Sequence, residues 1–384
     1  MLCVAFTGGG TGGHIYPGLA VASRLKEMAG CRLFWIGADT GMDRSIVEAA
    51  GLRFFGIPAG KLRRNFSLKN FTDLFRVIGG FFAARKILKR ERPVLLFSKG
   101  GFVSVPPCAA ASSLGLTVFT HESDFSPGLA TRLNARFASK GPGRIFTAYR
   151  ETAGLFPPKY RSRVTAAGNP VRGEFRTADA VRGREFAGFS EGALRPARGT
   201  GDGEKAILLV LGGSQGAVEL NDLVKATLSV LTCYYNVLHQ TGSNNESVPP
   251  ADGYKSFPYI KDELPSVLAA ADLVLGRSGA GTVWECAAAG KPMILVPLSG
   301  AGTRGDQVEN ARFFEKAGAA RVIGPGGFDE KAAALKAAVA LIAGDRALRD
   351  SMAASSAKIG SVDAAGSIAR AIVEAAGGET NASH

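Results

Sequence analysis

Short apolar runs of strand length alternate along this chain with longer amphipathic segments. In the first half the runs are LCVAF, RLFWIG, VLLFS, LTVFT and RIFTA; in the second half they are KAILLVLGG, YYNVLHQT, DLVLGRS, PMILVPL and AARVIG. Strands that alternate with helices pair in parallel, because each crossover returns the chain to the same end of the sheet. The pattern therefore predicts α/β architecture with helices on both faces of parallel sheets.

The alternation is interrupted once, by a charged, glycine-rich stretch at residues 173–204 that contains no strand candidate. A chain of 384 residues is also longer than one typical domain. We predict two doubly wound, Rossmann-like domains that face a central cleft. Their expected bounds are 1–165 and 204–349, with a linker or excursion at 166–203 and a C-terminal helix of about 350–384 that packs back on the first domain.

The two halves repeat one layout, in which an apolar strand runs into a glycine loop and a helix. VAFTGGGTGG corresponds to LLVLGGSQGA, and LLFSKGGFVS corresponds to LVLGRSGAGT. Ligands of open α/β sheets bind at the carboxyl ends of the strands. Four glycine loops are therefore expected around the ligands.

The opening loop FTGGGTGGHIYP has glycines at the G-x-G-x-x-G positions Gly8, Gly10 and Gly13. That pattern alone is weak evidence for a dinucleotide site, and Asp39, 26 residues after Gly13, is an imperfect ribose ligand. A loop for another phosphate or sugar, and a plain strand-to-helix turn, remain open at this point. His14 follows the glycines directly, where a neutral imidazole can act as a base toward a sugar hydroxyl.

LGGSQGA in the second half is the strongest match to a phosphate loop, with the hydroxyl of Ser214 beside its glycines and no P-loop lysine. A nucleotide whose phosphates are not hydrolysed fits it best. In RSGAGTVWECAAAG, Ser278 is expected to cap a helix and Gly290 to close it. Glu285 then lies about two turns inside, either as a ligand of a ribose diol or as a solvated helix acid.

The charge balance favours an acidic partner, since 46 Lys and Arg against 33 Asp and Glu give a net charge of +13. Residues 61–93 carry ten of these cations, interleaved with phenylalanine, leucine and isoleucine at helical spacing. A helix packed on the sheet explains part of this apolar stripe. Contact with an anionic membrane surface explains why cations and apolar residues occur together in the same segment. Nucleic acid is not expected, because no nucleic-acid-binding motif accompanies the charge.

Other sequence features limit the class of protein. No apolar stretch is long enough to span a bilayer, and no signal peptide is apparent at Met1. The five cysteines are far apart, so neither a disulfide framework nor a metal site is expected and a reducing cytosol fits.

Seven motifs of this chain resemble, in order and approximate spacing, those of the MurG family. They are TGGGTGGHIYPGLAVA, SKGGFVSVPP, HESD, GNPVR, LGGSQGA, RSGAGTVWECAAAGKP and DQVENARFFEKAGAA, within residues 3–325. Members are peripheral-membrane transferases that add N-acetylglucosamine to lipid I in bacterial cell-wall synthesis. The resemblance implies an inverting GT-B glycosyltransferase at the cytoplasmic face of the cell membrane, without cofactor or protein-bound metal. UDP-N-acetylglucosamine would bind mainly to the second domain and the lipid-linked diphosphate acceptor to the first.

The resemblance also implies roles for individual residues. His14 is the candidate base, and Gly100 and Gly101 belong to the acceptor pyrophosphate site. Arg172 and Ser214 would hold the ribose–diphosphate, with Glu285 on the ribose. The implied donor-binding residues are Thr11, Gly12, Gly13, Asp124, Arg172, Ser214, Ile260, Ala280, Gly281, Thr282, Val283, Trp284, Glu285, Gln307 and Asn310.

Three positions depart from the family pattern. His121-Glu122-Ser123-Asp124 stands where H-E-Q-N is usual, and PLSGAGTRGDQ gains two residues in a segment that often reads H-K-D-R-Q-Q. Trp284 replaces a small or aliphatic residue. These changes leave the choice of donor sugar open.

Three other functions remain as alternatives from the residues. A glycolipid synthase that uses a UDP-hexose and diacylglycerol would share the basic aromatic segment. An NAD-dependent oxidoreductase would rest on the opening glycines alone. A nucleotide-sugar-binding protein at the membrane surface could keep the fold without catalysis.

Overall fold

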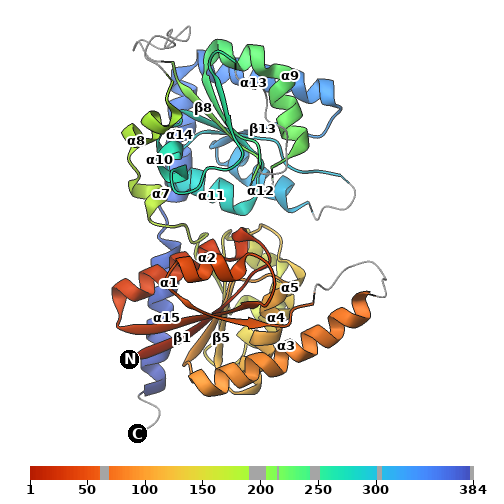
Figure 1. Cartoon of the computed structure of the whole chain (residues 1–384), viewed down its shortest axis with the longest axis vertical. Coiled ribbons are helices and arrows are strands. Elements are labelled where there is room, and N and C mark those ends of the chain that lie inside the picture. The colour runs from red at the N-terminus through yellow and green to blue at the C-terminus, as the bar shows by residue number, and fades with distance from the viewer. Residues whose placement is uncertain (61–68, 190–204, 214–215, 243–250, 301–304, 381–384) are drawn as a thin grey trace. The chain divides into compact units, whose positions relative to one another are not determined.

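A computed structural model of the chain describes residues 1–60, 69–189, 205–213, 216–242, 251–300 and 305–380. The chain divides into two compact units. The first comprises Met1–Arg172 together with Asp363–His384, and the second comprises Gly173–Val362. Figure 1 shows the elements of each unit. The prediction of two doubly wound α/β units is confirmed.

The first unit is built on a seven-stranded parallel sheet with the order β3-β2-β1-β4-β5-β6-β7. Its strands are β1 Leu2–Thr7, β2 Cys31–Ala38, β3 Arg53–Ile57, β4 Leu95–Ser98, β5 Thr117–Glu122, β6 Arg144–Thr147 and β7 Val164–Ala166. Its α-helices are α1 Tyr16–Met28, α2 Asp43–Ala49, α3 Lys69–Glu91, α4 Val105–Ser113, α5 Leu129–Ala138, α6 Pro158–Arg161 and α15 Ala364–Thr380. Short 3-10 turns are η1 Gly12–His14, η2 Phe102–Ser104 and η3 Glu151–Leu155. The edge strands β3 and β7 were not predicted.

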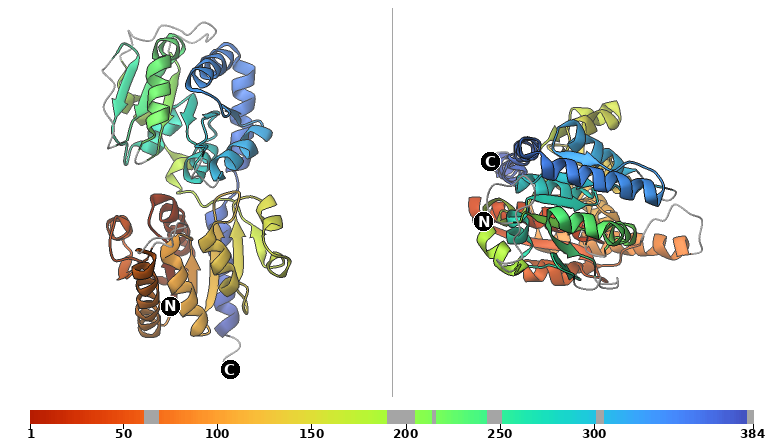
Figure 2. Two further views of the ribbon diagram at one scale, coloured as in Figure 1. Left: turned by 90° about the vertical axis from the view of Figure 1, so that its right-hand side faces the viewer. Right: turned by 90° about the horizontal axis from the view of Figure 1, so that it is seen from above.

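Both faces of this sheet are buried, which explains the uninterrupted apolar strands. Val4 and Phe6 of β1 pack in one core with α1 and α15, whereas Ala5 packs in the opposite core with α3 and α4. The helix α15 thus completes the first unit from the far end of the sequence, with Ile368 and Ile372 fully buried. Helices cover both faces of the sheet in Figure 2.

The second unit has a six-stranded parallel sheet with the order β10-β9-β8-β11-β12-β13. Its strands are β8 Ile207–Leu211, β9 Asn236–Gln240, β10 Tyr254–Phe257, β11 Leu273–Gly276, β12 Met293–Leu295 and β13 Ala320–Val322. Its helices are α7 Glu174–Thr177, α8 Ala180–Ala187, α9 Val218–Tyr234, α10 Leu264–Ala270, α11 Ala280–Ala288, α12 Asp306–Lys316, α13 Phe328–Gly344 and α14 Arg346–Gly360. The edge strand β10 was not predicted.

Two helices of the second unit, α7 and α8, lie in the stretch that the sequence indicates as a linker or excursion. The helix α8 packs closely on α10, because a Cβ on Gly183 would come within 2.0 Å of the Ser266 carbonyl oxygen. The helix α14 belongs to the second unit and α15 to the first.

The strand order reverses once in each sheet, between β1 and β4 and between β8 and β11. Successive crossovers leave such a point in opposite directions, so the helices on either side cover opposite faces. At each reversal point a backbone hydrogen bond joins the residue after one central strand to the last residue of the other. Lys99 N donates to Thr7 O at 2.8 Å, and Arg277 N donates to Leu211 O at 3.3 Å. The four glycine loops follow these four strands.

A buried histidine fixes the edge of the second sheet to α9. His239 Nε2 lies 3.1 Å from Asn221 Oδ1, and its Nδ1 lies 3.0 Å from the Tyr254 hydroxyl. Because the amide oxygen only accepts, Nε2 carries the proton and the tyrosine donates to Nδ1. Burial lowers the pKa of His239 to about 4. The imidazole is therefore neutral in the folded protein at physiological pH.

This histidine predicts a loss of stability in acid. Between an unfolded pKa of about 6.5 and the folded pKa of about 4, the unfolded chain binds the extra proton. Stability is therefore complete above pH 6.5 and falls as the pH drops toward 4, by roughly 3 kcal/mol from this group. His239→Gln, which can keep both hydrogen bonds, should make that loss smaller by about the same amount.

The measurement is urea unfolding at a series of pH values in a Trp35→Phe background. The chain has two tryptophans, so the fluorescence then reports Trp284 and the second unit. Equal acid sensitivity of the histidine and glutamine proteins would contradict the assignment.

Candidate functional site

The opening glycine loop is held from behind by a buried carboxylate. Gly10 N donates to Asp43 Oδ1 at 3.0 Å, and Ala38 N donates to Asp43 Oδ2 at 3.3 Å. A Cβ on Gly9 would lie 1.9 Å from the same carboxylate. Burial raises the pKa of Asp43, and the two backbone donors partly offset that shift. Because Asp43 occupies the Gly10 amide, this amide is not available for the pyrophosphate of a dinucleotide.

His14 lies against the second glycine loop of the same unit. A Cβ on Gly101 would come within 3.0 Å of the His14 ring, and one on Gly100 would lie 3.9 Å from His14 Nδ1. Both glycines have left-handed backbones, with φ of +87° and +79°. Thr11 and Gly13 are exposed, and Gly12 and His14 are half-buried. The structure thus brings the candidate base and the candidate acceptor loop together.

The Gly100–Gly101 loop stands on buried hydroxyl and amide groups. Gly100 N donates to Ser98 Oγ at 3.2 Å, and Ser104 Oγ donates to Gly101 O at 2.8 Å. Asn134 Nδ2 donates to both serine hydroxyls. The loop is therefore fixed in shape by the unit itself.

The HESD segment lies at the carboxyl end of β5. Glu122 accepts hydrogen bonds from Asp124 N at 3.1 Å and Gly128 N at 2.9 Å. His121 is fully buried, its Nε2 lies 2.9 Å from Gly168 O, and burial holds its pKa well below the usual range. Asp124 is half-buried.

Arg172 lies beside the opening loop. Its guanidinium stacks over the Tyr16 ring, 4.9 Å from the ring centre, at the first residue of α1. In the first unit, Arg172, His14 and both glycine loops thus lie at the carboxyl ends of the central strands. Sequence reasoning missed Tyr16 and Asp43, whose contacts depend on residues distant in the chain.

The first glycine loop of the second unit turns through left-handed Gly213 and Gly216 before α9 begins. Ser214 lies outside the described residues. Gln240, which sequence reasoning missed, donates to Gly213 O at 3.2 Å and accepts from Ile260 N at 2.9 Å. One buried amide therefore ties the predicted phosphate loop to Ile260, one of the implied donor-binding residues.

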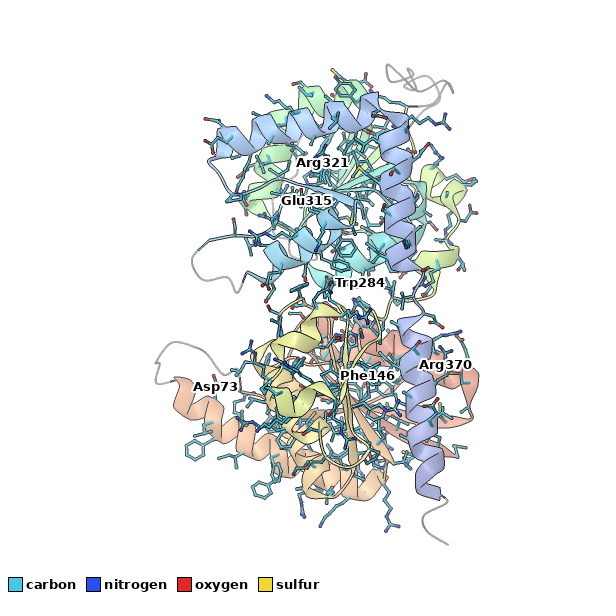
Figure 3. All side chains as sticks on the ribbon, turned by 180° about the vertical axis from the view of Figure 1, so that it is seen from behind. Asp73, Phe146, Trp284, Glu315, Arg321 and Arg370 are labelled. Carbon is cyan, nitrogen blue, oxygen red and sulfur yellow. The ribbon has the colours of Figure 1, made fainter. Side chains whose placement is uncertain are left out.

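The helix α11 begins after Gly279, and the prediction that Ser278 caps it was wrong. Ser278 Oγ instead donates to Gln307 O at 2.7 Å. Within α11, the side chains of Val283 and Trp284 are buried. Trp284, labelled in Figure 3, lies in the second unit. Its ring packs edge to face on Phe314 of α12, with 5.9 Å between ring centres.

The part of α11 that remains available to a ligand is consequently its first turn together with the side chain of Glu285. Ala280, Gly281, Thr282 and Glu285 are half-buried. The buried side chains of Val283 and Trp284 leave these two residues only backbone groups to offer a ligand. The amino-terminal amides of α11 suit an anion, and Glu285 suits hydroxyl donors.

Gln307 and Asn310 of α12 support two loops of the second unit with their side chains. Gln307 Oε1 accepts from Leu298 N at 2.9 Å, and the buried Asn310 donates to Ser278 O at 3.1 Å. Both of these implied donor-binding residues therefore make hydrogen bonds within the second unit.

A charged group that sequence reasoning missed joins β11 to α9. Arg277 donates to Val296 O at 2.9 Å and pairs with Glu219 at 2.8 Å, and Glu219 also pairs with Lys331. The bond from Lys331, followed by that from Arg277, lowers the pKa of Glu219. The two glycine loops of the second unit are thus linked through charged side chains.

Comparisons with known proteins cover most of the chain. The N-terminal domain of glycosyltransferase family 28 matches residues 4–141, and its C-terminal domain matches residues 207–365. The UDP-N-acetylglucosamine–N-acetylmuramyl-(pentapeptide) pyrophosphoryl-undecaprenol N-acetylglucosamine transferase of Treponema denticola is 49% identical, with 84% of each chain covered. The same-named proteins of Treponema pallidum (strain Nichols) and Shouchella clausii are 50% and 42% identical, over 84% and 83% of this chain and 82% and 85% of theirs.

Solved structures agree in fold. The crystal structure of Acinetobacter baumannii MurG superposes with a TM-score of 0.72 at 24% identity, over 97% of this chain and 100% of that one. The glycotransferase of kitacinnamycin gives 0.69 at 17% identity, over 97% and 98%. These likenesses support the GT-B type of fold. The sequence identities go further: this chain belongs to glycosyltransferase family 28 and, within it, to the MurG family of N-acetylglucosamine transferases.

Proposed function

We propose that this protein transfers N-acetylglucosamine from UDP-N-acetylglucosamine to undecaprenyl-diphospho-N-acetylmuramoyl pentapeptide, lipid I, to give lipid II. The observation that carries the proposal is the 49% identity to a transferase named for this donor and acceptor, over 84% of the chain. The braced loops at the reversal points of both sheets support it, since such loops are where α/β units bind phosphorylated ligands.

In the proposed donor site the second unit holds UDP-N-acetylglucosamine. The backbone amides at the amino-terminal ends of α9 and α11 donate to the diphosphate, and Glu285 accepts hydrogen bonds from the ribose hydroxyls. Ile260 packs near uracil, Ser214 contributes to the diphosphate site, and Gln307 and Asn310 lie toward the sugar. Thr11, Gly12, Gly13, Asp124 and Arg172 of the first unit complete the donor contacts in this proposal.

In the proposed acceptor site, Gly100 and Gly101 of the first unit receive the lipid diphosphate. A neutral His14 takes the proton from the attacking hydroxyl as the new bond to the sugar C1 forms. The bond from C1 to the UDP oxygen breaks on the opposite face, which inverts the configuration. Arg172 and the helix amino termini stabilise the diphosphate charge that develops on UDP.

A transfer assay with labelled UDP-sugars and a short-chain lipid I analogue tests the reaction. We expect N-acetylglucosamine transfer to that acceptor, with UDP-galactose and diacylglycerol as poor substrates. Transfer to diacylglycerol instead would identify a glycolipid synthase. Binding of the nucleotide sugar without turnover on either acceptor would identify a non-catalytic protein.

His14→Ala should lower kcat by about 100-fold or more, because general base catalysis contributes on that order. The affinity for UDP should change little, since the base acts on the acceptor hydroxyl. Rates at saturating substrates and a UDP titration measure the two effects. A variant with near wild-type kcat would exclude His14 as the base.

We further propose that α3 lies on an anionic membrane at the cytoplasmic face. Leu74, Phe75, Ile78 and Phe82 are exposed along one stripe of α3, and Lys86 and Lys89 are exposed in its last turns. Residues 61–68 of the same basic segment lie outside the described part. Among the described residues, no helix is long and apolar enough to cross a bilayer.

Phe75→Ser with Phe82→Ser should weaken binding to anionic vesicles at least tenfold, because each inserted phenylalanine contributes about 1.5–3 kcal/mol. Co-sedimentation with vesicles of phosphatidylglycerol measures the binding. Phe328→Ser, which removes an equally aromatic, exposed side chain from the second unit, is the matched control. Equal vesicle binding by the wild-type protein, the double variant and Phe328→Ser would contradict a membrane contact through α3.

A further inference from the structure

A buried lysine lies directly before the candidate acceptor loop. Lys99 is 1% exposed, and its Nζ donates to Ser123 Oγ at 2.7 Å. Ser123 in turn donates to Asn169 Oδ1. Asn169 precedes Arg172 by three residues in GNPVR. The three side chains therefore form a hydrogen-bond chain from the Gly100–Gly101 loop to the segment that carries Arg172.

The donors and acceptors of this chain allow one direction. An ammonium group only donates, so the Ser123 hydroxyl accepts from Lys99 and must direct its own proton to the amide oxygen of Asn169. A second contact joins the same elements, because His121 Nε2 lies 2.9 Å from Gly168 O. The carboxyl end of β5 is thus joined to the segment of residues 168–172 at two neighbouring points, and to Lys99 at one.

The lysine is costly where it lies. Burial lowers its pKa to about 8, although the charges of Glu122 and Asp124 act in the opposite sense. A methionine has similar length and fills such a space without a charge to desolvate. Packing alone does not explain an ammonium at this position, whereas a directional donor to Ser123 does.

We propose that Lys99 is a positioning residue which, through Ser123 and Asn169, holds the Gly100–Gly101 loop in register with the segment of Arg172. Its effect is to fix the acceptor diphosphate relative to the guanidinium that stabilises the departing UDP. This inference rests on the proposed function for the two segments.

The test compares Lys99→Met, Ser123→Ala and the double variant in the transfer assay. We expect each single variant to lower kcat about tenfold or more, with less than a twofold change in KM for UDP-N-acetylglucosamine. The double variant should be no slower than Lys99→Met, because the effects of substituting two residues in one hydrogen-bond network are not additive. Lys140→Met is the matched control, since Lys140 makes the same kind of bond, to Ser112 Oγ at 3.1 Å, on an exposed part of the same unit.

Hydrogen exchange separates this inference from the proposed reaction. The amides of residues 97–103 and of residues 167–172 other than Pro170 should exchange at least fivefold faster in Lys99→Met and Ser123→Ala, and at the wild-type rate in Lys140→Met. Unchanged exchange in the first two variants overturns the inference, whatever their activity. Three other results also overturn it. They are a wild-type kcat in the single variants, losses of kcat that add in the double variant, and losses of kcat that a smaller fraction of folded protein explains. A wild-type protein that transfers no sugar refutes the proposed function but leaves the exchange result decisive for Lys99.

Discussion

The single reversal of strand order in each parallel sheet is the constraint on which the rest of the site depends. At β1 and β4, and again at β8 and β11, the chain leaves the sheet toward opposite faces. No crossover connection passes over the carboxyl ends of the two central strands, so the loops there and the helix amino termini beyond them remain available. Anionic ligands suit such ends because unpaired amides and the helix dipole both favour negative charge.

Glycine loops at these ends need support, because glycine by itself leaves the backbone free to move. In the first unit the support comes from Asp43 behind Gly10 and from Asn134 beneath the Gly100–Gly101 loop. In the second unit it comes from Gln240 and Asn310. These buried polar groups satisfy loop amides and carbonyls that would otherwise be costly to bury. Such support gives a binding loop one shape before its ligand arrives.

The sequence predicted the central strands and the order of the glycine loops, because strands buried on both faces are continuously apolar. It missed β3, β7 and β10, which are edge strands with partly exposed residues. The expected cap was wrong because the Ser278 hydroxyl finds Gln307 O, a partner 29 residues away. Asp43 and Gln240 were missed for the same reason: Asp43 is 33 residues from Gly10, and Gln240 is 27 from Gly213. Local patterns identify a loop, but not the distant side chain that holds it.

A crystal structure of the protein with UDP would test most directly whether the second unit's reversal point binds the nucleotide. The diphosphate should lie at the amino-terminal ends of α9 and α11, with the ribose hydroxyls on Glu285 and uracil near Ile260. A nucleotide bound instead at the Gly8–Gly13 loop, with Glu285 facing solvent, would contradict the assignment of donor binding to the second unit.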